Sequence, residues 1–339
     1  MKKFLLFMLG VLLALPGIAR DFEYTYEGQT LTYTVISESA KTCMTKSGTE
    51  GPNGRYVEWG NYITGELIIP SVAKNGGVEY TVTEIGFGSF YHNPLTSLTI
   101  PESVTTIGSR SFEGCHLSSM FLGNSVTKIC DKAFYGCDDL RSLTLPETVT
   151  TIGRYAFYEC TGLTSLTLPE AVTSIGGFAF SECTGLTSVT IGNSVTTIGY
   201  GSFRHCTGLT SVTIPDAVTE IEGYAFNSCT NLRSVAIGNS VTKIGDMAFG
   251  YCGSLSSVII PESVTIIDSS AFHTCTGLTS VTIGNSVTTI GNMAFHDCRG
   301  LTSVLIPNSV TRIDGAAFSS CIYNHRTTKT NQKYPSVNL

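Results

Sequence analysis

Residues 152–174 read Ile152-Gly153-Arg154-Tyr155-Ala156-Phe157-Tyr158-Glu159-Cys160-Thr161-Gly162-Leu163-Thr164-Ser165-Leu166-Thr167-Leu168-Pro169-Glu170-Ala171-Val172-Thr173-Ser174. A phenylalanine followed three residues later by a cysteine returns every 23 residues, at Phe134, Phe157, Phe180, Phe203, Phe226, Phe249, Phe272, Phe295 and Phe318. Two earlier copies, at Phe90 and Phe112, are one residue shorter, and Asn93 stands in the first cysteine position. Such a period is typical of a solenoid, in which each unit buries its core only by stacking on its neighbours.

Each unit contains one clear strand signal. Leu163, Leu166 and Leu168 fit the L-x-x-L-x-L pattern of a leucine-rich repeat, and polar residues alternate with them. Val172 and Ile175 predict a second short extended segment, and Ala-Phe-x-x-Cys predicts a tight helical or irregular turn. Parallel rungs stack about 4.8 Å apart. We therefore predict a mainly β repeat protein, a right-handed leucine-rich-repeat solenoid of about eleven 22–23-residue rungs with a small N-terminal β cap.

The period divides the chain into four segments. Residues 1–19 resemble a secretory signal peptide, because Lys2 and Lys3 precede an apolar run too short for a transmembrane helix, and small residues permit cleavage after Ala19. Residues 20–66 lack the period but alternate as strands do, which predicts the β cap, and residues 67–321 form the solenoid. Residues 322–339 form a polar, basic tail that we expect to be irregular.

These ends predict where the protein acts. With a leader, no second membrane segment and no cysteine before Cys43 to carry a lipid anchor, the protein is expected to be secreted or displayed at the cell surface. The last rung lacks its strand after Cys321, so either the tail covers the end of the core or the chain is a shortened version of a longer design. An open core end also predicts end-to-end self-association.

Twelve cysteines in an exported chain would ordinarily suggest disulfides. Ten of them share one slot of the repeat, from Cys115 to Cys321, where a small buried hydrophobe fits, so we predict free core thiols. Neighbouring rungs are close enough for occasional pairing, although side chains in register give poor S–S geometry. Cys43 and Cys130 lie outside this slot and are expected to differ chemically.

The sequence contains no set of residues that indicates catalysis. Nucleophile-elbow, zinc-protease, phosphate-loop and dinucleotide-binding motifs are absent, and isolated acids on scattered rungs form no acid–base pair. His273 and His296 share a slot on adjacent rungs and should lie about 5 Å apart, either as a metal or pH-sensitive pair or as two solvated loop side chains. We expect no catalytic residue, no cofactor and no metal ligand, and the net charge of −6 argues against nucleic acid as a partner.

The outward positions of the predicted strand are the candidate partner-binding site. The first is serine on nearly every rung and the second is mostly threonine, with four apolar exceptions. The candidate residues are Phe121, Ser165, Thr167, Ser188, Thr190, Ser211, Thr213, Ala236, Ile259 and Leu305. One interpretation is a solvated row of hydroxyls that suits strands. The other is a docking surface on which the apolar exceptions are anchors.

The repeated Ile-Gly-x-x-Ala-Phe-x-x-Cys-x-x-Leu-x-x-Val-x-Ile-Pro-x-Ser-Val-Thr resembles the BspA-like branch of the bacterial leucine-rich repeats. Residues 198–219 (with Ser202 for alanine) and 244–265 carry it well, and it extends over residues 67–321. The resemblance implies an exported, surface-associated bacterial protein from a family linked with adhesion to host proteins, other cells or matrix. It brings no catalytic residues.

We therefore expect a secreted or cell-surface module that binds a protein ligand on a host cell or in the extracellular matrix, without catalysis. The alternatives are a glycan-binding surface protein, a truncated scaffold fragment that binds nothing, and, least favoured, an enzyme with an unfamiliar site. The lack of a Trp/Tyr platform argues against glycan, since the one tryptophan, Trp59, falls in the cap region.

Overall fold

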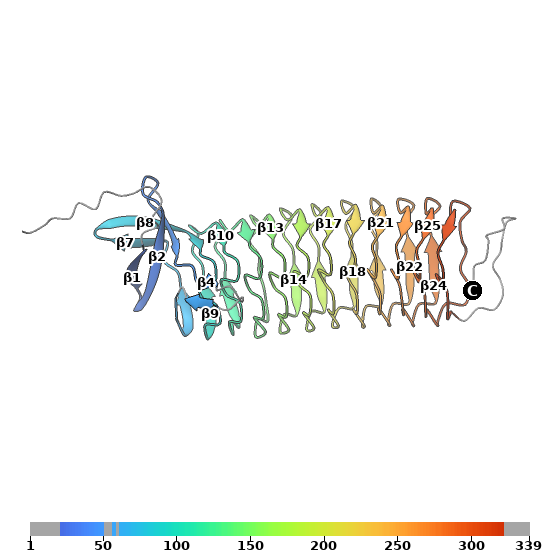
Figure 1. The fold of residues 1–339 in the computed structure, drawn as a ribbon, viewed down its shortest axis with the longest axis horizontal. Helices are drawn as coiled ribbons and strands as arrows, with labels where there is room; N and C mark the ends of the chain where they lie inside the picture. Colours follow the sequence, from blue (N-terminus) through green and yellow to red (C-terminus); the bar gives the residue numbers. More distant parts are fainter. Residues whose placement is uncertain (1–20, 51–55, 59–60, 322–339) are drawn as a thin grey trace, which may run out of the picture.

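The computed structural model describes residues 21–50, 56–58 and 61–321, which form a long rod of stacked rungs with a cap at its N-terminal end (Figure 1). The described residues form strands and turns but no helix, so none of them makes a helix that could cross a membrane. The leader and tail predicted for residues 1–19 and 322–339 lie outside the described part, as does Trp59.

The cap is built by antiparallel strands that feed into the rod. Strand β1 (Asp21–Tyr26) pairs with β2 (Gln29–Ser37), which pairs with β3 (Thr42–Thr45), and β3 runs parallel to β8 (Val78–Ile85). Strand β7 (Val72–Asn75) forms a hairpin with β8 through Gly76 and Gly77, whose φ angles of 56° and 85° favour glycine. Two short strands, β4 (Thr49–Glu50) and β5 (Tyr56–Glu58), pair with each other in antiparallel fashion.

One long parallel sheet continues from β8 along the rod (Figure 1). Each rung contributes two residues, an outward residue and an isoleucine that packs inward. These strands are β10 (Thr106–Ile107), β12 (Lys128–Ile129), β13 (Thr151–Ile152), β15 (Ser174–Ile175), β17 (Thr197–Ile198), β19 (Glu220–Ile221), β21 (Lys243–Ile244), β23 (Ile266–Ile267), β25 (Thr289–Ile290) and β26 (Arg312–Ile313). They are the second extended segment that the sequence predicted.

The L-x-x-L-x-L segments form the other side of the rod as three shorter parallel sheets. The first contains β6 (Gly65–Ile68), β9 (Leu95–Thr99) and β11 (Ser119–Phe121), the second contains β14 (Ser165–Thr167) and β16 (Ser188–Thr190), and the third contains β18 (Ser211–Thr213), β20 (Ser234–Ala236), β22 (Ser257–Ile260) and β24 (Ser280–Ile283). Serine pairs with serine across neighbouring strands, as at Ser165 and Ser188. The mainly β solenoid is confirmed.

The Ala-Phe-x-x-Cys segment is a turn and not a helix. In the rung of Phe157, Tyr155 and Glu159 have φ angles of 57° and 58°, and the equivalent residues of the other rungs are also left-handed. The backbone N–H groups of these turns donate to carbonyls of the next rung, as from Phe157 to Ala179 at 2.8 Å. The rungs are therefore hydrogen-bonded to one another along the turns as well as along both sheet faces.

Eleven phenylalanines form one continuous stack through the core, from Phe90 to Phe318. Successive ring centroids lie 5.2 to 5.5 Å apart with interplanar angles of 1° to 10°, and each ring is less than 2% exposed. Offset stacked rings at this separation attract one another beyond their burial of apolar area. The stack explains why the same residue recurs, because any smaller side chain would leave a gap between two rings.

The cysteines of the repeat, Cys115 to Cys321, form a second ladder beside the rings. Each thiol donates to the phenylalanine carbonyl of the preceding rung, for example from Cys229 to Phe203 at 3.2 Å. The same carbonyl accepts the backbone N–H of the cysteine in its own rung, as from Cys206 to Phe203 at 3.3 Å. All twelve cysteines are free, which agrees with the predicted core thiols.

Asn93 takes the cysteine position where the first rung meets the cap. Its side-chain amide donates to the Asn61 carbonyl at 2.9 Å, and its side-chain oxygen accepts the Ile63 N–H at 2.9 Å. The chain before this rung is irregular, so some of its backbone N–H and C=O groups need side-chain partners. The Asn93 amide can donate to one such group and accept from another at the same time, which a thiol could not do here.

We expect Phe226→Ala to lower the free energy of unfolding by about 3–5 kcal/mol, because it removes one ring from the middle of the stack. Urea denaturation followed by circular dichroism measures the loss. Thr213→Ala, at an exposed strand position, is the matched control and should stay within about 0.5 kcal/mol of the original chain. Equal effects from the two substitutions would contradict the role of the stack.

The ladder thiols are expected to resist alkylation in the folded protein. Burial raises the pKa of Cys115, Cys183 and Cys229 to about 12, and the thiolate is the reactive form. Mass spectrometry after iodoacetamide treatment near neutral pH should find the half-buried Cys130 modified first. Rapid modification of the ladder thiols without denaturant would show that the rungs open readily.

Candidate functional site

The strand face has the arrangement that the sequence predicts. It consists of the outward residues of β9, β11, β14, β16, β18, β20, β22 and β24 and the equivalent positions of the other rungs. Ser165, Thr167, Ser188, Thr190, Ser211, Thr213, Ala236, Phe121, Ile259 and Leu305 are all exposed. The inward residues between them, such as Leu166 and Val212, are buried. All ten candidate residues thus lie on one side of the rod.

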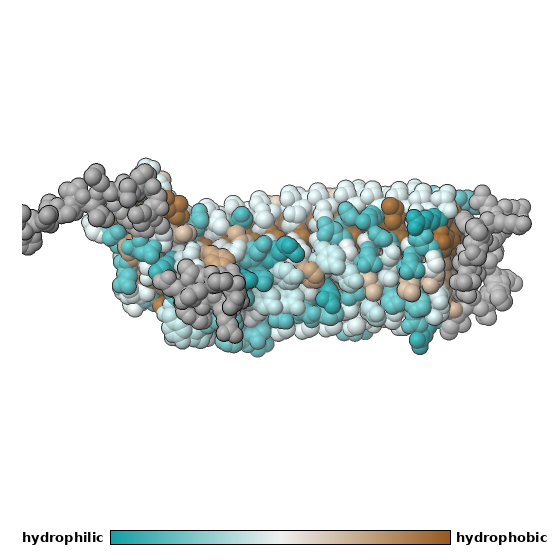
Figure 2. All heavy atoms as spheres, viewed as in Figure 1, coloured by the Kyte–Doolittle hydropathy of each residue, from teal (hydrophilic) through white to brown (hydrophobic). Residues whose placement is uncertain are grey.

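The structure brings three of the four apolar candidates near one another. Ala236 and Ile259 occupy the same slot on paired strands, and Leu305 follows two rungs after Ile259. Phe121 lies five rungs before Ala236, or roughly 24 Å away at the spacing of parallel strands. The exposed fractions of Phe121, Ile259 and Leu305 are 54%, 69% and 67%. On the side of the rod drawn in Figure 2, hydrophobic residues are scattered on a largely polar and neutral surface.

A group of aromatic residues on the turns was not found by the sequence analysis. We call it the turn stripe, and it consists of Tyr135, Tyr155, Tyr158, Phe178, Tyr200 and Tyr224. These rings form an unbroken series of contacts over five rungs with centroids 4.8 to 5.5 Å apart. They occupy three different slots around the core phenylalanine, so the repeat does not align them. The sequence does contain a signal for the turn stripe, because consecutive rungs have an aromatic residue close to the core phenylalanine.

Two of the five ring contacts in the turn stripe are face to face. Tyr135 stacks on Tyr158, and Tyr155 stacks on Phe178, with interplanar angles of 18° and 7°. The Lys132 ammonium lies 5.5 Å from the centroids of both the Tyr135 and Tyr155 rings. Burial, reinforced by Glu159, raises the pKa of Tyr135 to about 12, so its hydroxyl stays protonated. Faces that stack on each other are not available to a flat ligand.

The predicted histidine pair is confirmed in its geometry. The rings of His273 and His296 stack with centroids 5.1 Å apart and an interplanar angle of 11°, and Tyr251 contacts the outer edge of the pair. Among the described residues, neither Nδ1 atom has a hydrogen-bond partner. Burial, and then the neighbouring His296, lowers the pKa of His273, while Asp297 opposes this shift.

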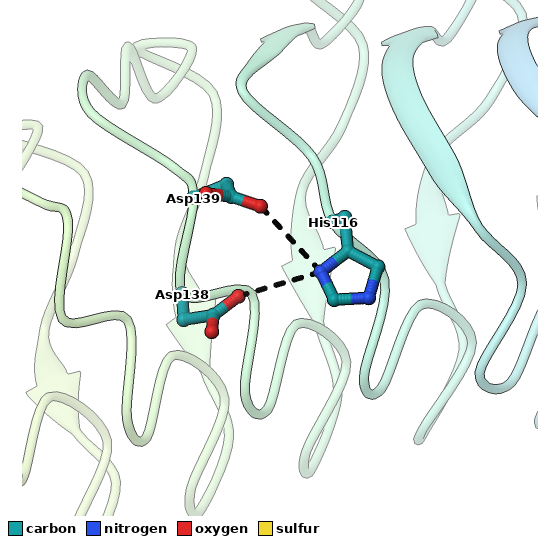
Figure 3. A group of neighbouring side chains, drawn as sticks. All are labelled: His116, Asp138 and Asp139. Carbon is teal, nitrogen blue, oxygen red and sulfur yellow. Dashed lines mark ion pairs between the residues drawn. The ribbon is translucent and has the colours of Figure 1, made fainter.

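Three potential metal ligands come together on adjacent rungs where the sequence analysis expected none. His116 Nδ1 lies 3.7 Å from Asp138 Oδ1 and 3.5 Å from Asp139 Oδ2 (Figure 3). All three side chains are more than half exposed. They were missed because His116 shares its slot with no other histidine. The sequence does contain a signal for this group, because His116 and Asp138 are separated by the length of one rung.

Comparison with known proteins identifies the repeat. A family model described as BspA type leucine rich repeat region (6 copies) matches twice, over residues 83–210 and 196–324. No curated protein matches this chain. A leucine-rich repeat protein from Bacteroides ovatus has 26% identity and a TM-score of 0.60, with 88% of this chain and 91% of that one covered. A leucine rich cell surface protein from Faecalibacterium prausnitzii has 26% identity and a TM-score of 0.50, with coverage of 88% and 86%.

The histidine pair predicts a pH dependence of stability. Because the pKa of His273 is lowered in the folded state, the unfolded chain binds more protons once the pH falls below the ordinary histidine value near 6.5. We therefore expect the melting temperature to fall between about pH 7 and pH 5, and to fall less in His273→Gln. An equal fall of the melting temperature with pH in the two proteins would contradict this. His92, whose pKa burial also lowers, should account for part of the remaining decline.

Proposed function

The chain belongs to the BspA-type leucine-rich repeat family, and on that premise we propose that it is a secreted or cell-surface protein that binds a protein partner through its strand face. The partner class is a host-cell or extracellular-matrix protein, and binding involves no catalysis. The surface protein of Faecalibacterium prausnitzii supports the location. The observation that carries the proposal is the exposure of Ile259 and Leu305 at positions where most rungs have threonine.

The strand face suits a rigid docking surface. Its strands are held in register by parallel pairing, and threonine hydroxyls at the edge of the sheet add bonds between rungs, as from Thr187 to the Thr164 carbonyl at 3.0 Å. A surface already ordered in the free protein loses little conformational entropy on binding. The hydroxyls around the apolar positions would form the polar rim that surrounds the apolar centre of an interface.

The apolar positions favour a protein over a glycan. Fully burying one leucine or isoleucine side chain stabilises a complex by about 1.5–3 kcal/mol. Ile259 and Leu305 are aliphatic and offer no ring face for stacking on a sugar. In the turn stripe, the faces of Tyr155 and Phe178 stack on each other. Both observations support aliphatic and polar contacts with a protein surface.

The proposal predicts that charged residues at the apolar positions abolish binding. In the variant Phe121→Lys, Ile259→Lys, Leu305→Lys, each lost anchor should weaken binding by about 30-fold, at roughly 2 kcal/mol per anchor. Binding is measured on parallel arrays of matrix proteins and glycans. The matched control is Thr151→Lys, Ser174→Lys, Ile266→Lys, which adds the same charge at exposed outward positions of the long sheet on the other side of the rod.

The outcomes distinguish the alternatives. Loss of protein binding in the first variant but not in the control supports the proposal, provided that the melting temperature of both variants is unchanged. Binding to glycans alone would favour a glycan-binding protein. Binding to neither array would favour a scaffold, and equal loss in both variants would show that added charge, and not the apolar anchors, is responsible.

A further inference from the structure

His116, Asp138 and Asp139 lie on the turns that lead from the cysteine ladder to the strand face. His116 immediately follows Cys115, and the two aspartates immediately follow Cys137 on the next rung, so stacking places them side by side (Figure 3). The three ligand atoms all lie within 4.8 Å of one another. In the described part of the chain, this is the one group of three histidine, cysteine or carboxylate side chains so arranged.

The other rungs serve as an internal reference for these positions. The residues after the cysteine are Thr-Gly in four of the full-length rungs, beginning at Thr161, Thr184, Thr207 and Thr276. Asp138-Asp139 replaces that pair, and His116 occupies the rung that is one residue shorter. Neither change improves the packing of the core, because all three side chains are exposed. Departures from a repeat that bring no packing gain are expected at functional positions.

The same two rungs contain the break between the first and second sheets of the strand face. Strand β11 ends the first sheet and β14 begins the second, and the rung between them contributes a single bridge, from Leu143 to Leu166. His116 lies three residues before β11, on one side of the break. Asp138 and Asp139 belong to the rung that has no strand on this side of the rod, although it contributes to the long sheet.

The distances fit a coordination sphere better than a hydrogen bond. The separations of 3.5 and 3.7 Å from His116 Nδ1 exceed the usual N–H···O range of about 2.7–3.2 Å. By contrast, His205 Nδ1 approaches Glu182 Oε1 to 2.5 Å in the same structure. Ligands bound at about 2.0–2.2 Å to a tetrahedral Zn²⁺ lie about 3.3–3.6 Å from one another.

We propose that His116, Asp138 and Asp139 form a site for a divalent transition-metal ion of the Zn²⁺ class. One imidazole nitrogen with two carboxylate oxygens is a ligand set that zinc accepts, whereas Ca²⁺ and Mg²⁺ prefer oxygen ligands alone. Three protein ligands leave an open position for water or for a group of a bound partner. The ion links two rungs across the break and lies beside the rung of Phe121, at one end of the strand face.

Calorimetric titration of the metal-free chain with ZnCl₂ tests the site. We expect one saturable equivalent, and a higher melting temperature with Zn²⁺ than without it, because an ion that binds only the folded state stabilises it. His116→Ala should weaken Zn²⁺ binding by at least about tenfold. The double substitution Asp138→Thr, Asp139→Gly should do the same, and it restores a sequence that the other rungs already fold with.

Controls separate this site from other histidines and other ions. The variant His273→Ala, His296→Ala should keep the full affinity of the original chain, and CaCl₂ should give no comparable binding. Hydrogen exchange should slow at Ser119–Phe121 and around Leu143 when Zn²⁺ is added. Unchanged affinity in both ligand variants, or the absence of saturable Zn²⁺ binding by the original chain, would overturn the proposal.

Discussion

The phenylalanine carbonyl of each rung is the point on which the stacking depends. It accepts the backbone N–H of its own cysteine and the thiol of the next, as at Phe203, where Cys206 and Cys229 both donate. The ring of the same residue stacks on its two neighbours. A carbonyl has two acceptor sites, and both are used here in a fully buried position, where an unsatisfied acceptor would be costly. One residue thus fixes the separation, the register and the apolar core of adjacent rungs.

A rod held this way determines how a surface site can form. Among the rungs that the structure describes, no unit folds back to meet a distant one. A functional group of side chains must therefore come from the same slot, or adjoining slots, of neighbouring rungs. Ala236 and Ile259 on the strand face meet in this way, as do Tyr155 and Phe178 in the turn stripe. His116 and Asp138 follow the same rule from adjoining turns. Such sites are elongated, shallow and rigid, which suits the recognition of other surfaces.

The repeat also separates structural residues from functional ones more sharply than a globular fold does. Where eleven copies agree, as at the core phenylalanine, the reason is packing. Where one rung departs on the exposed side, as Ile259 does, packing supplies no reason, because its side chain is 69% exposed. The solvent-facing departures are therefore the residues through which this protein differs from a generic solenoid, and they concentrate on the strand face, the turn stripe and the turns at His116.

The sequence by itself determined the rungs, their two strands and the buried ladders, because Phe, Cys and Leu recur at fixed spacing and identical residues stack only in register. It also placed Ile259 and Leu305 outward, since alternation along a strand assigns each side chain to one side. The tertiary structure alone decided which residues of different slots meet. The path of each turn through two left-handed residues, such as Tyr155 and Glu159, sets the direction of the side chains around it. That path assembles the turn stripe from three different slots of the repeat, which no periodicity in the chain records.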